Sequence, residues 1–226
     1  MQDDGSSAQS ATRTAAIAAP ESRFHVPLVA LLVFTGGFSV MAIELLGGRI
    51  MAPYFGSSIH VWGSIITVFM AALSLGYLLG GWLSLREPSL TRMALIFLAS
   101  GLTVLPLLVL GEPMMEWVFT NFEDPRYGSL LAAVLLFFVP TVALGMISPY
   151  AIRLLVRVTQ HSGQVAGTLY FLSTLGSAVG TLMTAFYLVL WFEVSTIVLA
   201  VAGALITSAA LAVLGDHLGR NAGARS

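Results

Sequence analysis

The chain has 226 residues, of which 57% are hydrophobic and only 9% are charged, and its net charge is −1. A soluble domain carries about 25% charged residues, so this chain has too little polar surface for a soluble body and is expected to lie in lipid. Its ten basic residues, all arginine, are balanced by eleven acidic ones, which excludes the positive field of a nucleic-acid-binding protein. The absence of cysteine excludes disulfides, thiolate catalysis and cysteine metal sites.

Six apolar stretches are predicted to cross the membrane, which takes about 20 helical residues for a core of about 30 Å. They are residues 26–46, 61–85, 93–110, 130–148, 165–191 and 195–214. Helix is the expected state because backbone groups in lipid must find partners within their own segment. The sequence therefore predicts an all-α, polytopic integral membrane protein with a six-helix domain over residues 26–215. Residues 1–25 are predicted to form a disordered cytoplasmic tail, and residues 216–226 a short cytoplasmic one.

The arginines predict the orientation of these helices. With the N-terminus inside the cell, eight arginines are cytoplasmic and only Arg49 and Arg126 lie outside. This asymmetry fits the positive-inside rule and places both termini in the cytoplasm. Between the third and fourth stretches, residues 111–128 mix aromatic, methionine and glutamate side chains, which suits a short helix in the headgroup layer.

A weak internal repeat relates the second and fifth stretches. The second stretch contains LSLGYLLG at residues 73–80, and the fifth contains LSTLGSAVG at residues 172–180. Each of them follows a Pro-Tyr pair, at residues 53–54 and 149–150. Two consecutive three-helix units must be inverted relative to one another, an arrangement common in transporters. The repeat therefore indicates two inverted three-helix units.

Glycines at one-turn spacing mark this repeat and predict close helix packing. Gly76 and Gly80 form one GxxxG pair, and Gly176 and Gly180 form the other. Small residues one turn apart let a neighbouring backbone approach closely. Packing within the bundle is the simplest interpretation; a sliding surface or a homodimer seam is the alternative.

Glu44, Arg49 and Tyr54 form the candidate ligand site. A carboxylate in hydrocarbon is costly unless it is paired or hydrated. In an ideal helix Glu44 and Arg49 lie about 140° apart, but a helix that ends or unwinds at Gly47 and Gly48 would bring them together. The pair is then either a salt bridge that fixes the helix end or a site for a cationic or zwitterionic ligand, with Glu44 as its counter-ion.

Arg153 and Arg157 share a helix face on the predicted cytoplasmic side. Membrane topology and contact with anionic lipid explain them without further function, and docking of a cytoplasmic protein is the alternative. The sequence has no Rossmann fingerprint, P-loop, G-x-S-x-G elbow or H-E-x-x-H motif. No cofactor, metal site or catalytic residue is therefore expected, and catalysis by this chain alone is not predicted.

Two motif blocks resemble a known family. The first comprises AIELLGGRIMAPYFGSS at residues 42–58, VWGSII at 61–66 and LSLGYLLGG at 73–81. The second comprises GMISPYAIRL at 145–154, GQVAGTLY at 163–170 and STLGS at 173–177. Over residues 28–215 the chain resembles the membrane half of the bacterial membrane-bound spermidine synthase-like proteins, also called fused MFS/spermidine synthases.

The resemblance implies a fold like half of a major-facilitator transporter, in the bacterial inner membrane. Longer members join these helices to a cytoplasmic aminopropyltransferase-like domain, and residues 215–226 hold no counterpart of it. The first functional hypothesis is a membrane module that anchors a separate aminopropyltransferase-type partner and binds an amine. The second is a small transporter of polyamine-like cations, homo-oligomeric and dependent on Glu44. An autonomous membrane enzyme is the third and least supported.

Overall fold

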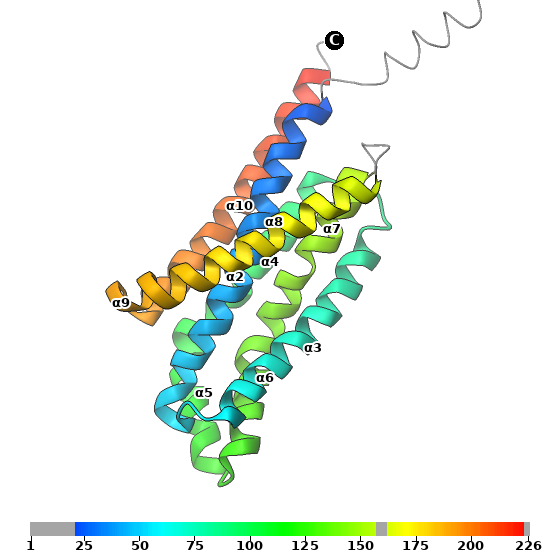
Figure 1. Cartoon of the computed structure of the whole chain (residues 1–226). Helices are drawn as coiled ribbons and strands as arrows, with labels where there is room; N and C mark the ends of the chain where they lie inside the picture. Colours follow the sequence, from blue (N-terminus) through cyan, green and yellow to red (C-terminus); the bar gives the residue numbers. More distant parts are fainter. Residues whose placement is uncertain (1–20, 157–161, 224–226) are drawn as a thin grey trace, which may run out of the picture.

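The computed structural model describes residues 21–156 and 162–223, and it is built of helices (Figure 1). Six helical spans are long and apolar enough to cross a membrane, which confirms the predicted all-α polytopic membrane fold. They are Val26–Phe55, Ile59–Leu83, Leu90–Asn121, Pro125–Val156, Ser162–Trp191 and Val194–Gly219.

Short interruptions divide some spans into several helices. The helices are α2 (Glu21–Phe55), α3 (Ile59–Leu83), α4 (Leu90–Val104), α5 (Pro106–Asn121), α6 (Pro125–Gly145), α7 (Ile147–Val156), α8 (Ser162–Met183), the π-helical turn η1 (Thr184–Leu188), α9 (Val189–Trp191) and α10 (Val194–Gly223). The start of α2, the end of α3 and the end of α10 lie at one end of the bundle, called here the N-side (Figure 1). The other end is called the far side.

The first and last helices extend beyond the predicted boundaries. Helix α2 begins at Glu21 instead of residue 26, and α10 continues to Gly223 instead of ending near residue 215. Of the two predicted tails, only residues 1–20 and 224–226 lie outside the described residues. The hydrophobic stretches therefore mark the part of each helix that crosses lipid, while polar residues extend the helix at its ends.

The prediction that the first helix ends or unwinds at its two glycines is wrong. Helix α2 is continuous through Gly47 and Gly48 to Phe55. A Cβ atom at Gly47 would lie 3.3 Å from the Phe137 ring, and one at Gly48 would lie 2.7 Å from the Trp62 ring. The glycines thus make room for two aromatic rings that pack against the helix, and this packing keeps the helix intact.

The third span also differs from its prediction, because the segment after residue 110 is not a separate helix in the headgroup layer. Helix α5 continues the span of α4 after an interruption at Leu105, next to Pro106, which has no amide hydrogen to bond the preceding turn. Met115 and Val118 of α5 are fully buried. The segment is therefore part of the packed bundle, and its glutamates lie on the exposed side.

The spans pack in pairs that follow the predicted repeat. The most extensive contacts join α2 to α8, α3 to α6, and α4 to α10. Matching the first three spans to the last three makes α2 equivalent to α6, α3 to α8, and α4 to α10. The α2–α8 contact is then equivalent to the α6–α3 contact. The α4–α10 contact joins two equivalent helices. The fifth span is the least buried of the six, so α8 lies at the edge of the bundle, where it crosses in front of α2 (Figure 1).

The first crossing brings α8 against the backbone of α2. A Cβ atom at Gly176 would lie 2.2 Å from the carbonyl oxygen of Phe34, and one at Gly180 would lie 2.5 Å from that of Phe38. Conversely, a Cβ atom at Gly37 would lie 2.1 Å from the carbonyl oxygen of Ser173. Only glycine allows the two backbones to approach this closely.

The second crossing has the same pattern between α3 and the fourth span. A Cβ atom at Gly76 would lie 2.4 Å from the carbonyl oxygen of Val142, and one at Gly80 would lie 2.5 Å from that of Met146. Gly145 takes the place of Gly37, since a Cβ atom at Gly145 would lie 3.1 Å from the carbonyl oxygen of Leu73. The two crossings therefore match residue for residue, which supports two three-helix units.

The Pro-Tyr pairs are not part of this correspondence. Pro53 and Tyr54 lie in the last turn of α2, whereas Pro149 and Tyr150 lie in the first half of α7, close to the helix crossing. The similarity of the two dipeptides is therefore not structural.

Tyr150 instead holds the loop between α3 and α4. Its side chain is fully buried, and its hydroxyl group accepts a hydrogen bond from the Ser89 amide at 2.9 Å and donates one to the Ser89 carbonyl at 3.2 Å. Arg92 donates to the carbonyl oxygens of Arg86 and Glu87 in the same loop. The loop is thus fixed to the fourth span at the N-side.

Removal of the Tyr150 hydroxyl should loosen this loop. We expect Tyr150→Phe to lower the free energy of unfolding by about 1 kcal/mol and to increase amide hydrogen exchange over residues 84–89 several-fold. Hydrogen-exchange mass spectrometry measures both the size and the place of the effect. Tyr170→Phe is the control, because the Tyr170 side chain is exposed; equal exchange in the two variants would contradict the assignment.

Candidate functional site

Glu44 lies inside the first span and has no partner there. Its side chain is partly buried, and no hydrogen bond or ion pair within 4.0 Å is found for its carboxylate among the described residues. It precedes Arg49 by five residues, or about 7.5 Å along the helix axis, so it lies deeper in the membrane than the arginine. An unpaired carboxylate at this depth is costly and is a candidate binding group.

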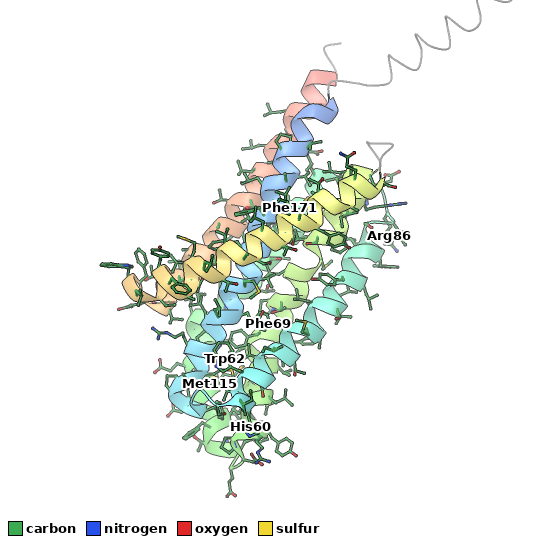
Figure 2. All side chains as sticks on the ribbon, in the orientation of Figure 1. His60, Trp62, Phe69, Arg86, Met115 and Phe171 are labelled. Atoms are coloured by element: carbon green, nitrogen blue, oxygen red, sulfur yellow. The ribbon has the colours of Figure 1, made fainter. Side chains whose placement is uncertain are left out.

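Neighbouring helices cover the α2 face that carries Glu44 on the N-side and on the far side of this residue, but not at Glu44 itself. By helical geometry Gly37, Glu44 and Gly48 lie within about 40° of one another. Gly37 is covered by α8, through Ser173, and Gly48 by α3, through Trp62 (Figure 2). Since α3 and α8 do not pack along one another over the described residues and diverge toward the far side (Figure 1), Glu44 lies on the α2 face between them.

The predicted site of Glu44, Arg49 and Tyr54 is not assembled. Arg49 is exposed, and its Nη2 atom lies 3.5 Å from the carbonyl oxygen of Val189 in the fifth span. Tyr54 lies ten residues, or about 15 Å, beyond Glu44 along the helix, where its ring packs edge-on against Phe119. Because α2 remains helical, no Glu44–Arg49 salt bridge forms among the described residues, and the three side chains are not brought together. Ligand binding by each of them stays a prediction.

Two buried threonine hydroxyls near the depth of Glu44 were not predicted from the sequence. The Oγ1 atoms of Thr141 and Thr184 are buried and have no hydrogen-bond partner within the described ranges, residues 21–156 and 162–223. Thr184 follows Gly180 by one turn, which places it beside the α2 turn that follows Phe38. Thr141 follows Phe137 by one turn, and the Phe137 ring covers Gly47 of α2. Buried polar groups without partners are rare in folded proteins, so both are candidate ligand contacts.

Thr184 also begins the five-residue π-helical turn η1. A π-helical turn inserts one extra residue into an α-helix and is frequently found at functional sites. The turn separates the tightly crossed part of α8 from the far-side end of the span, which includes Val189. The fifth span therefore changes its helical register at the depth of Glu44.

The remaining predicted residues lie at the N-side or in the helix crossings. Gly76, Gly80, Gly176 and Gly180 face the backbones described above. Arg153 is exposed near the end of α7, whereas Arg157 lies outside the described residues. Among the described residues, no group of three or more His, Asp or Glu side chains is placed to hold a metal ion.

No protein-family model matches the chain, and neither a curated protein nor a solved structure is significantly similar to it. The fold and the site define a polytopic membrane protein of six helical spans, with a carboxylate in the first span that has no partner among the described residues.

Proposed function

We propose that this chain is a membrane module that binds a cation at Glu44 and carries it across the bilayer. The observation that supports this most is the partly buried Glu44 carboxylate inside a membrane span, for which the described part of the chain supplies no partner. A carboxylate accepts hydrogen bonds only, so its complement is a positively charged donor such as an ammonium group. The hydroxyls of Thr141 and Thr184 add acceptors at a similar depth.

The matching helix crossings support transport over static binding. In transporters built from inverted repeats, one unit rocks against the other around a site near the membrane midplane. The α2–α8 and α3–α6 crossings are such matching elements, and in both of them glycines of one helix lie against the backbone of the other. The resemblance to spermidine synthase-like membrane proteins points to a polyamine-like amine as the cation.

Uptake by proteoliposomes tests this function. We expect purified protein to take up labelled putrescine or spermidine saturably, and Glu44→Gln to weaken binding about 100-fold, since loss of one partner of a desolvated charge pair costs about 3 kcal/mol. Glu112→Gln is the matched control, because Glu112 is an exposed carboxylate of the third span. No uptake above empty vesicles, or unchanged affinity in Glu44→Gln, would refute the proposal.

A second function is favoured by Arg153, which is exposed and forms no hydrogen bond or ion pair among the described residues. In this proposal the chain anchors a separate soluble protein of aminopropyltransferase type, and Arg153 docks it together with Arg157. Mild-detergent purification from the native membrane followed by mass spectrometry of the intact assembly distinguishes the two. A stoichiometric soluble partner that Arg153→Glu releases supports docking; a homo-oligomer without such a partner supports transport.

Both proposals place the N-side in the cytoplasm of a bacterial cell and both termini inside. Because the chain has no cysteine, single cysteines report topology without background. We expect a cysteine at Arg86 to react with an impermeant maleimide only in opened membrane vesicles, and one at Asn121 to react in intact cells. Reaction of both from the same side would overturn the six-span orientation.

A further inference from the structure

An apolar cavity of about 340 Å³ lies between the first, fifth and sixth spans. Its lining includes Phe38 of α2, Leu188 and Phe192 at the end of the fifth span, and Ala200 and Ala204 of α10. The volume is within the range of small-molecule sites, about 300–1,000 Å³. The two alanines are one turn apart, and their small side chains leave space against α10.

Two of the three hydroxyl groups in the lining are already bonded within their own helix, and the third belongs to Thr196 near the start of α10. The hydroxyl of Thr35 donates to the Leu31 carbonyl at 3.0 Å, and that of Ser39 donates to the Thr35 carbonyl at 2.8 Å. Both bonds are made within α2. The rest of the lining is apolar, so the cavity suits a hydrocarbon chain.

Arg49 lies on the same helix face as Phe38, about 16 Å nearer the far side. Its guanidinium group reaches the Val189 carbonyl, next to Leu188 of the cavity wall, and no carboxylate lies within 4.0 Å of it among the described residues. The hydrocarbon of one leaflet is about 15 Å thick. Arg49 therefore lies at the far-side end of the cavity, and its distance from Phe38 along the helix, about 16 Å, is close to the length of an acyl chain in one leaflet.

A negative charge also borders the cavity. Glu193 comes directly after Phe192 of the cavity wall, in the turn between α9 and α10, and is exposed; it accepts a hydrogen bond from Ser195 at 3.5 Å. Glu193 and Arg49 do not pair with each other within 4.0 Å. Opposite charges near the same cavity match a zwitterionic headgroup, whose phosphate and ammonium are held apart.

We infer that this cavity holds one phospholipid with an ethanolamine headgroup from the far-side leaflet. One acyl chain fills the space between α2 and α10, the phosphate binds Arg49 and the ammonium group binds Glu193. The π-helical turn η1 ends at Leu188 in the cavity wall. This inference does not depend on cation binding at Glu44.

Native mass spectrometry tests the inference on delipidated protein in mild detergent, with phosphatidylethanolamine and phosphatidylglycerol added in equal amounts. We expect one phosphatidylethanolamine per chain and about tenfold weaker retention in Arg49→Gln, as for the loss of one charge-assisted hydrogen bond. Ala200→Phe and Ala204→Phe should each remove the bound lipid by filling the cavity. Glu193→Gln should shift the preference toward phosphatidylglycerol.

Two matched controls separate this site from general lipid contact. Arg126 is another exposed arginine of the far side, and Ala99 is an exposed alanine of α4, so Arg126→Gln and Ala99→Phe should retain the lipid. Equal retention of both lipids by every variant would mean adventitious annular lipid only and would overturn the inference. A lipid-free homodimer of the unmodified chain would overturn it too, because a second copy would then cover the cavity.

Discussion

Substitution of Gly176 or Gly76 by alanine should destabilise the bundle by about 2–3 kcal/mol, and substitution by leucine should prevent correct assembly. At both positions the added Cβ atom would lie within 2.5 Å of a carbonyl oxygen of the neighbouring helix. This neighbour is backbone, so no side-chain rotation relieves the clash, and the helices must separate. Thermal unfolding followed by tryptophan fluorescence measures the loss.

Substitution of two other glycines by alanine serves as the control, because it should not lower the stability. A Cβ atom at Gly81 or Gly167 would meet no atom within 4 Å, although these residues lie on the same helices, α3 and α8. Alanine there should be neutral or stabilise by up to about 1 kcal/mol, because glycine is a poor helix former. Equal effects at Gly76 and Gly81, or at Gly176 and Gly167, would contradict the close-packing explanation.

The same series tests the correspondence of the two crossings. If the α2–α8 and α3–α6 pairs are equivalent, Gly76→Ala and Gly176→Ala should lower the unfolding temperature by similar amounts. A large effect at one glycine and none at the other would mean that only one crossing supports the bundle. The matching contacts would then be a resemblance in shape without a shared role.

Hydrophobicity was sufficient to predict six membrane spans, because each crossing requires about 20 apolar residues in sequence. It was not sufficient to predict where helices end. Gly47 and Gly48 are poor helix formers, and nothing local shows that the rings of Phe137 and Trp62 pack against them. Similarly, the glutamates of α5 suggested a surface helix, whereas Met115 on its other side is buried in the bundle.

The candidate site was only partly predictable for a related reason. Glu44 was identified because a carboxylate within an apolar stretch is unusual in any arrangement. Its relation to Arg49 depended on whether the helix breaks, which tertiary contacts decide. Thr141 and Thr184 could not be recognised, because threonine hydroxyls in membrane helices usually bond the carbonyl four residues earlier, as Thr181 does with Ser177.

Glu44→Gln should stabilise the protein while it removes cation binding. Glutamine keeps the size and shape of the side chain but carries no charge, and a charged carboxylate within a membrane span costs about 3 kcal/mol before hydration relieves it. In the absence of ligand we therefore expect a gain of about 1–2 kcal/mol, or a rise in unfolding temperature of about 2–8 °C. Thermal unfolding with and without spermidine measures both effects in one experiment.

A gain in stability together with a loss of cation binding distinguishes a binding group from a structural one. If Glu44 fixed the helices in place, its replacement would lower stability and ligand would not matter. If it is kept for binding, the unmodified protein should be stabilised by spermidine and the variant should not, because only a ligand that binds the folded state raises its stability. The exposed Glu112 gives the baseline, since its charge is hydrated in both states and Glu112→Gln should change neither quantity. Residues that lower stability are commonly kept because function needs them. Binding of a cation is the function that explains a destabilising carboxylate at this position.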